Sequence, residues 1–217
     1  MEITYIGHSC FKIKGKTLSL VIDPYDPKKT GYKLPKLDAD AVLVTHDHED
    51  HNFTQGVSDF KMLINTAGEY ETEDVFINGI EVYHDEKDGS ERGRNVMYLL
   101  ELEGVSILHC GDLGHPLAKE TLERIPNVDI LLVPVGGTYT IDGETAVDVI
   151  SELEPGIVIP MHYQTDDLKG ITGLEPLEKF LDEMGADGKA RKESKLKISS
   201  KSDIPEDTTV VVLEPQH

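Results

Sequence analysis

A dense group of histidines and acids directly after an apolar run is the feature that most constrains this chain. Residues 41–44 read A-V-L-V and residues 45–51 read T-H-D-H-E-D-H. The run predicts a buried strand, and side chains two apart on extended backbone point the same way. His46, His48 and Asp50 are therefore expected to face one point, and His51 a neighbouring point. Imidazole and carboxylate are ligands that zinc accepts, so the segment predicts two adjacent metal sites, as used for hydrolytic displacements.

The spacing of these histidines excludes one common metal motif. A helical zincin motif needs two histidines four residues apart, whereas the pairs here lie two, three or five residues apart. The alternative is a solvated, charged loop that happens to contain histidines. Histidine and aspartate clustered just past a buried strand fit a metal site better than that alternative.

Length and composition favour one large soluble domain. The chain has 217 residues, of which 38% are hydrophobic, and this is enough for a sizeable core. It has no stretch of 18 apolar residues, so we expect no membrane span. The first residues have neither a basic lead nor a long apolar segment, which argues against a signal peptide. Cys10 and Cys110 are too few for a disulfide framework, so we expect reduced thiols in a cytoplasmic protein.

The charge balance disfavours nucleic acid as a partner. The net charge is −20, from 41 acidic against 21 basic residues, and it repels phosphate backbones at long range. A local exception is the group of lysines and arginines within residues 189–201. A basic patch can act even on an acidic protein, but we favour a solvated linker for this group.

The apolar pattern predicts short strands at first and alternating strands and helices after Pro116. The tail strands are expected at sheet edges, and Asp142 is the expected N-cap of a helix. The expected strands are residues 2–6, 11–13, 17–22, 41–44, 61–64, 75–78, 80–83, 96–102, 105–109, 129–133, 156–159, 196–199 and 208–213, and the expected helices are residues 53–59, 117–124, 143–153 and 173–184.

The motif H-x-H-x-D-H after an apolar strand resembles the metallo-β-lactamase superfamily. The resemblance extends over nearly the whole chain, because later histidines and acids follow in the family's order. It implies an α/β fold, a four-layer αββα sandwich, built as a single domain over residues 1–217 with halves of about 1–115 and 116–217. The segments H-C-G-D at 109–112 and P-M-H-Y at 160–163 are similar to the ascorbate-phosphate-lactonase-like branch of zinc-dependent hydrolases.

The resemblance also implies a set of ligands for two divalent ions, with Zn²⁺ as the default and Mn²⁺ or Fe²⁺ as alternatives. Asp112 would bridge the two ions, and Asp23 and His109 would orient the ligands through hydrogen bonds. Taken alone, His84 has a second interpretation, a surface histidine beside the acidic residues 85–88, and His162 alone is similarly ambiguous. The implied ligands are His46, His48 and His84 for the first ion and Asp50, His51 and His162 for the second.

Residues that contact the substrate are less clearly marked in the sequence. Tyr139 and Tyr163 are candidates, although aromatic packing is an equal alternative. Arg92 and Arg94 lie in a glycine-containing loop and are candidates for binding an anionic group, with surface ion pairs as the alternative. His8, in a turn after the first strand, could line the mouth of the site or be structural.

The resemblance implies hydrolysis by a metal-bound hydroxide, with Asp50 as both a ligand and the catalytic proton acceptor. His48 stands where redox di-iron relatives carry glutamate, which favours hydrolysis. The expected partner is a small-molecule substrate, namely a lactone, an ester or a phosphate ester. Two alternatives stay open: a metal-dependent nuclease and a metal-binding interaction module without turnover.

Overall fold

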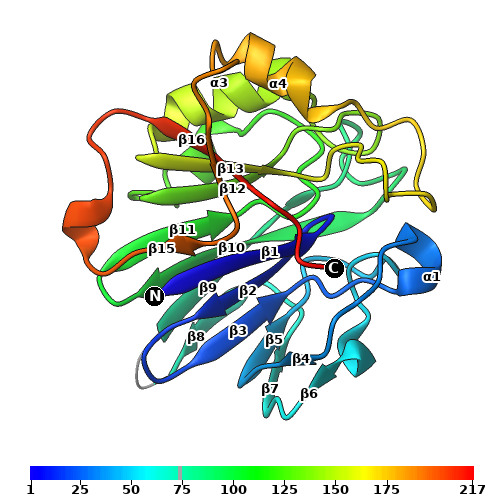
Figure 1. Ribbon diagram of the computed structural model, residues 1–217, viewed down its shortest axis with the longest axis vertical. Coiled ribbons are helices and arrows are strands. Elements are labelled where there is room, and N and C mark those ends of the chain that lie inside the picture. Colours follow the sequence, from blue (N-terminus) through cyan, green and yellow to red (C-terminus); the bar gives the residue numbers. More distant parts are fainter. Residues whose placement is uncertain (73–74) are drawn as a thin grey trace.

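Two β-sheets packed face to face form the centre of the molecule, which is known from a computed structural model that describes residues 1–72 and 75–217 (Figure 1). The six-stranded sheet has the order β15 (Leu196–Lys197), β1 (Glu2–Gly7), β2 (Cys10–Lys14), β3 (Ser19–Ile22), β5 (Ala41–Leu43) and β7 (Met62–Ile64). The eight-stranded sheet has the order β14 (Arg191–Glu193), β16 (Thr209–Leu213), β13 (Ile157–Met161), β12 (Ile130–Pro134), β11 (Val105–His109), β10 (Arg94–Leu102), β9 (Val75–Tyr83) and β8 (Gly68–Glu71).

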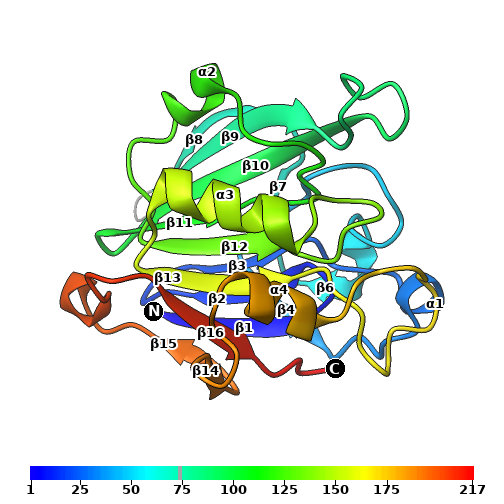
Figure 2. The same cartoon turned by 90° about the horizontal axis from the view of Figure 1, so that it is seen from above.

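Helices cover the outer face of the eight-stranded sheet. Figures 1 and 2 show α3 (Gly143–Leu153) and α4 (Leu177–Glu183) side by side on this face. Ala146 and Val149 of α3 and Phe180 of α4 are fully buried in the same core cluster as the strands. Burial of such an apolar helix face contributes about 25 cal/mol for each Å² removed from water, so this layer is held mainly by the hydrophobic effect.

The outer face of the six-stranded sheet is covered differently. Alternation sends Leu20 and Ile22 of β3 into the central core and Val21 into a second cluster on the outer face. Tyr25, Tyr32 and Leu168 cover that second cluster from irregular segments. Prolines at 24, 27 and 35 interrupt this part of the chain, so the only regular elements here are the short ones α1 (Pro27–Thr30), β4 (Leu37–Asp38), η1 (Thr54–Gly56) and β6 (Val57–Ser58).

The architecture confirms the predicted mixed α/β sandwich, with the outer layer of the first sheet built largely from loops. Tyr98 of β10 ties the two sheets together, because its buried hydroxyl lies 2.9 Å from the Val44 carbonyl oxygen and 3.2 Å from that of Ile64. None of the helices within residues 1–72 and 75–217 is long and apolar enough to cross a membrane.

Several predicted elements differ from the structure. The helix expected over residues 53–59 is wrong, because only η1 forms before Val57 pairs with Leu37 in β6 and β4. The helix expected over 117–124 shortens to α2 (Lys119–Leu122). The helix expected from 173 begins only after Pro176, because the residue before a proline avoids helical backbone.

Several strands also differ from prediction. The strand expected over 196–199 forms as β15 at an edge of the six-stranded sheet, but the rest of the basic stretch expected as a linker contributes β14 and η2 (Lys201–Asp203). Since β14 pairs with β16, the tail strand β16 lies inside the sheet rather than at its edge. Residues 75–78 and 80–83 form one strand, β9, whose Gly79 leaves room for the carbonyl oxygen of Thr66, 3.0 Å from where a Cβ would lie.

Candidate metal centre

The predicted ligands follow the ends of four strands that meet at one end of the sandwich. Residues 45–51 follow β5, His84 follows β9, Asp112 follows β11 and His162 follows β13. Parallel pairing of β11, β12 and β13 puts the carboxyl ends of these strands at the same edge, where α/β folds place their ligand contacts. The structure therefore brings residues from across the chain to one place.

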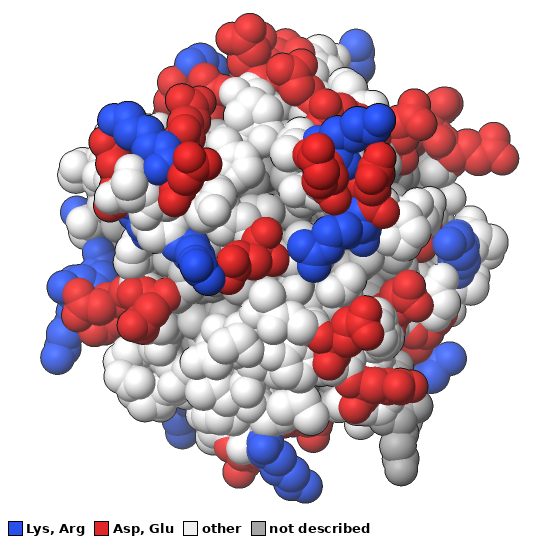
Figure 3. All heavy atoms as spheres, turned by 180° about the vertical axis from the view of Figure 1, so that it is seen from behind, with Lys and Arg blue, Asp and Glu red and all other residues white. Residues whose placement is uncertain are grey.

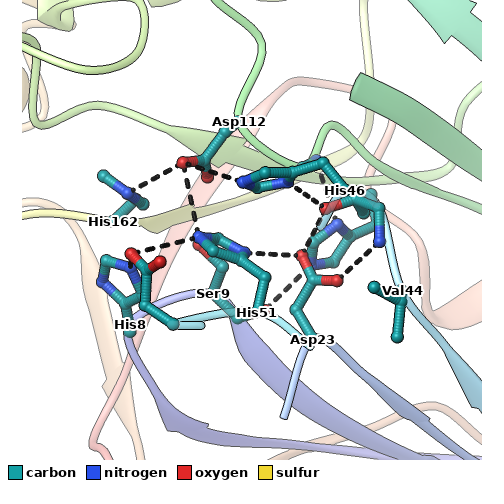
Figure 4. A network of polar contacts seen from close by, with 12 residues as sticks. His8, Ser9, Asp23, Val44, His46, His51, Asp112 and His162 are labelled. Carbon is teal, nitrogen blue, oxygen red and sulfur yellow. Dashed lines mark hydrogen bonds and ion pairs between the residues drawn. The ribbon is translucent and has the colours of Figure 1, made fainter. Parts of the chain in front are cut away.

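Asp112 lies at the centre of this group. Its Oδ2 atom is 3.1 Å from Nε2 of His162, 3.3 Å from Nε2 of both His51 and His84, and 3.8 Å from Nε2 of His46. Figure 4 shows the rings of His162, His51 and His46 arranged around this carboxylate. All five side chains are buried, and a carboxylate shared by so many imidazoles is the arrangement expected of a group that serves two ions.

The predicted ligands form overlapping groups on the basis of distance. The candidate ligand atoms of His46, His48 and His84 lie within 4.8 Å of one another, and so do those of His8, Asp50, His51 and His162. These two groups correspond to the ligands predicted for the first and second ions, with His8 in addition, and a third group within the same distance, His46, His51 and Asp112, connects them.

Buried polar atoms without hydrogen bonds indicate whether ions fit the cluster of predicted ligands. Within residues 1–72 and 75–217, Nε2 of His46, Nε2 of His51 and Oδ1 of Asp112 are buried and have no hydrogen-bond partner. Leaving such atoms unsatisfied costs about 1–3 kcal/mol each, and an imidazole nitrogen or a carboxylate oxygen is an ordinary ligand for zinc. The donor set therefore fits divalent cations.

Asp23 is hydrogen-bonded to the histidine-rich segment, residues 45–51. It has a left-handed backbone, with φ of 49°, and no exposed surface. Its carboxylate accepts hydrogen bonds from the Thr45 backbone N–H at 2.8 Å and from the Thr45 hydroxyl at 2.7 Å. Its Oδ2 also lies 3.0 Å from Nδ1 of His51 (Figure 4). Because a carboxylate only accepts, Nδ1 of His51 carries the proton and Nε2 is left free to face an ion.

His109 and Asn95 fix the loop that carries Asp112. The Gly111 N–H donates to Nδ1 of His109 at 3.0 Å, so Nε2 of His109 bears the proton and donates to the Ser9 carbonyl at 2.9 Å. Asn95 accepts from the Asp112 N–H at 3.1 Å and donates to the Cys110 carbonyl at 2.8 Å. The sequence pointed to His109 but not to Asn95, whose one signal is an amide directly before the apolar run 96–100 of β10.

His8 is the second residue that the sequence left without a role. It is fully buried, with φ of 57°, and its Nε2 lies 3.1 Å from Oδ2 of Asp50. Burial lowers the pKa of His8 to about 4, so the ring is neutral near pH 7 and Nε2–H donates to the carboxylate. The His8 carbonyl accepts from the Tyr5 hydroxyl at 2.8 Å and from the His162 N–H at 2.9 Å. The second bond connects the turn of His8 to the segment of the predicted ligand His162.

The charges of the cluster favour cation binding. Burial alone would lower the pKa of His51, but the carboxylates of Asp112 and Asp50 raise it above its ordinary value. Burial would raise the pKa of Asp112, but His162 and His51 hold it well below its ordinary value. The carboxylates are thus ionised at neutral pH, and binding of a cation is expected to displace a proton from His51. Burial lowers the pKa of His46 and of His48, so both are present as the neutral, ligating form.

A cavity of about 520 Å³ opens over the cluster. Two of the four candidate substrate contacts, Arg92 and Tyr139, line it. The other two lie elsewhere. Arg94 is an exposed residue of β10 paired with Glu81 at 2.9 Å, and Tyr163 is 5% exposed and packs beside Tyr5 with ring centroids 6.4 Å apart.

Sequence comparisons identify a family of hydrolases. The family model described as "Beta-lactamase superfamily domain" matches residues 2–162. A UPF0173 metal-dependent hydrolase of Thermoplasma volcanium is 33% identical over 196 residues, covering 77% of this chain and 86% of the relative. A UPF0173 metal-dependent hydrolase of Thermoplasma acidophilum is 30% identical over 193 residues, covering 77% and 85%.

Comparisons with solved structures agree with this result. A Thermotoga maritima protein described as a candidate Zn-dependent hydrolase of the metallo-β-lactamase superfamily is 34% identical, with a TM-score of 0.80 and coverage of 99% of both chains. Igni18, a metallo hydrolase from Ignicoccus hospitalis, is 20% identical, with a TM-score of 0.68 over 100% of this chain and 96% of that one. The second likeness concerns the fold alone.

Proposed function

This chain belongs to the metallo-β-lactamase superfamily, among its UPF0173 metal-dependent hydrolases, and we propose a reaction for it. In this proposal the protein uses two divalent ions to hydrolyse a small lactone, ester or phosphate ester. The prediction of a metal-dependent enzyme is thereby confirmed. The observation that supports two ions is the position of Asp112 Oδ2, within 3.8 Å of ring nitrogens from both ligand clusters.

In this proposal His46, His48 and His84 would hold one ion, and Asp50, His51 and His162 the other. Asp112 would serve both. We propose Zn²⁺, because a set dominated by neutral imidazoles and carboxylates suits it. Mn²⁺ and Fe²⁺ are accepted by similar sets, so availability also decides occupancy.

When bound, the two cations supply Lewis acidity, which lowers the pKa of a water molecule toward about 7 and polarises the bond to be cleaved. Side chains of the protein accept the proton and orient the reacting groups. Asp50 is the proposed proton acceptor, since it lines the cavity and stays ionised. Burial would raise the pKa of Asp50, but His51 and His8 hold it below its ordinary value. The hydrogen bond from His8 fixes which way this carboxylate points.

A nuclease is the second candidate function, and the surface charge does not favour it. Four of the six basic residues in 189–201 pair with acids, among them Lys195 with Glu2 at 3.0 Å and Lys201 with Asp129 at 3.2 Å. On the face shown in Figure 3, basic and acidic side chains are interspersed. Phosphodiester binding normally requires cationic contacts along the backbone, and acids interspersed among the cations weaken such contacts.

The proposal is tested by removing all metal, restoring Zn²⁺, Mn²⁺ or Fe²⁺ one at a time, and measuring hydrolysis of a panel of lactones, esters, phosphate monoesters and RNA. His48→Ala and Asp50→Ala should abolish turnover while circular dichroism shows an intact fold. His217→Ala is the matched control, because His217 packs on Tyr32, with ring centroids 4.2 Å apart, and is in neither ligand cluster. Full turnover in Asp50→Ala, or cleavage of RNA alone, would contradict the proposal.

A further inference from the structure

The wall of the cavity over the ligand cluster includes positively charged side chains that have no role in the proposed chemistry. Besides the ligands, its wall includes Lys29, Arg92 and Tyr139. We propose that the substrate carries a second anionic group, a carboxylate or a phosphate, away from the bond that is cleaved, and that Arg92 binds this group. The inference rests on the proposed function for the position of the reacting bond, but the anion site itself is open to a separate test.

The backbone of Arg92 is fixed by a buried carboxylate. Asp85, which is 3% exposed, accepts hydrogen bonds from the backbone N–H groups of residues 87, 89, 91 and 92, at 2.8, 3.0, 3.1 and 2.8 Å. The His84 N–H in turn donates to the Gly93 carbonyl at 3.0 Å, which closes the loop. Asp85 therefore holds Arg92 at a set position relative to the neighbouring ligand His84.

The guanidinium group of Arg92 is held at one side and open at the other. One nitrogen donates to the Thr138 carbonyl at 3.2 Å, and the group lies 5.7 Å from the centroid of the Tyr139 ring. The nearest carboxylate in the described residues is that of Glu91, at 3.9 Å. Arginine has five N–H donors in a planar fork, so enough of them remain for a two-point contact with an anion.

Lys29 is the other cation of the cavity wall, and it is already engaged. Its ammonium group lies 2.5 Å from the carboxylate of Glu49, and both side chains are largely exposed. An incoming anion would have to break that pair and remove a strongly hydrated ammonium from water. Arg92, one-third exposed and resting on Tyr139, is the better anchor.

The charge of the cavity with ions in place also favours an anionic substrate. The carboxylates that line it are Asp47, Glu49, Asp50 and Asp112. Lys29 is paired with Glu49, so two dications would more than balance Asp47, Asp50 and Asp112 and, with Arg92, would leave the cavity wall with a net positive charge. The alternative role for Arg92 is structural, as a tie between the loop of residues 85–92 and Thr138, and the experiment below separates the two roles.

The test measures binding, not turnover. Calorimetry on the zinc-loaded protein compares diacids with monoacids of equal length: succinate with butyrate, glutarate with pentanoate, and adipate with hexanoate. One carboxylate of each probe can reach the ions, so the second carboxylate reports on Arg92. The variants are Arg92→Gln, Arg92→Lys, Lys29→Gln and, as the control with the same charge change two residues away on β10, Arg94→Gln.

We expect the wild type and Arg94→Gln to bind at least one diacid about tenfold more tightly than its monoacid, a preference that Arg92→Gln loses and Arg92→Lys partly keeps. If 3-phosphonopropionate binds more tightly than succinate and Arg92→Gln removes that excess, the anion is a phosphate rather than a carboxylate. Any of three results would overturn the inference: no diacid preference in the wild type, a preference that survives in Arg92→Gln, or a preference that disappears only in Lys29→Gln. An equal loss for diacids and monoacids in Arg92→Gln would assign it the structural role.

The two proposals fail in different ways. An Arg92-dependent diacid preference without hydrolysis of any lactone, ester or phosphate ester would leave the anion site standing and refute the proposed function. Hydrolysis of neutral esters without a diacid preference would support the proposed function and refute the anion site.

Discussion

Oδ2 of Asp23 lies 3.0 Å from Nδ1 of His51, and neither side chain has any exposed surface. The contact links the end of β3 to the segment after β5, and it fixes which nitrogen of His51 carries the proton. The same oxygen accepts from the Thr45 hydroxyl, at 2.7 Å. Asp23 thus determines the orientation of a proposed ligand and is in none of the groups of candidate ligand atoms itself.

Replacing Asp23 by Asn should weaken metal binding while the fold is kept. The amide group has the same shape, but an NH2 donor replaces one of the two oxygens, and it must then face either the Thr45 backbone N–H or the Thr45 hydroxyl and Nδ1–H of His51. Loss of such a supporting hydrogen bond typically costs about 10–100-fold in metal affinity. Competition with a chromophoric chelator measures the change. Asp38→Asn, at an exposed ion pair with Lys12, is the control and should bind as the wild type does; equal affinities in all three proteins would contradict the role given to Asp23.

Gly111→Ala should displace Asp112. Gly111 has φ of 56°, and a Cβ there would lie 2.3 Å from Oδ1 of Asn95 and 2.8 Å from Cβ of Thr45. Gly104→Ala is the control, because Gly104 also has a positive φ, 79°, but nothing within 4 Å of its Cβ position. Both variants incur the backbone penalty of about 1–2 kcal/mol. Only Gly111→Ala should also lose bound metal, as measured by elemental analysis, and normal metal content there would show that the loop tolerates the clash.

His8→Leu tests whether His8 orients Asp50 or binds an ion itself. If Nε2–H only donates to Asp50, the variant should retain both ions and lose turnover, by about tenfold or more, because the proton acceptor is no longer held. Metal content and kcat are measured on the same preparation. Loss of one equivalent of metal would instead make His8 a ligand of the second cluster.

Asp129 supplies a prediction about pH that is independent of the metal centre. Burial would raise its pKa, but hydrogen bonds from Ser106 and the ion pair with Lys201 lower it below the ordinary value. A folded-state pKa below the unfolded one stabilises the protein at neutral pH, and this contribution is lost as the pH falls below about 4.

Asp129→Asn should therefore lower the free energy of unfolding by about 1–3 kcal/mol at pH 7, and the difference from wild type should shrink on acidification. Urea unfolding at several pH values measures it, with the exposed Asp207→Asn as the control. A deficit that stays constant from pH 7 to pH 3 would show that the charge of Asp129 contributes nothing.

Elements with strong local signals were predictable from the sequence. The helix expected over 143–153 is α3, and Asp142 caps it by accepting from the Thr145 N–H at 2.9 Å. The strands expected over 96–102 and 105–109 leave Glu103 and Gly104 to connect them, and these two residues have φ of 55° and 79°, as a tight hairpin needs. Ligands grouped after β5 could be read from spacing, because extended backbone fixes the direction of each side chain.

Features that depend on pairing between distant segments could not be predicted. Residues 191–193 form a strand only because β16 lies beside them. The position of His8 depends on Tyr5 and on the backbone of His162, which lies 154 residues further along the chain. Arg92 and Arg94 look alike in the sequence, but one belongs to a loop over the cavity and the other to the exposed side of a strand.

The most direct test of two ions around Asp112 is a crystal structure of the zinc-loaded protein with data collected at the zinc absorption edge. We predict two anomalous peaks, both within bonding distance of Asp112, one held by His46, His48 and His84 and the other by Asp50, His51 and His162. A single peak at full occupancy, or two peaks that Asp112 does not touch, would contradict the account.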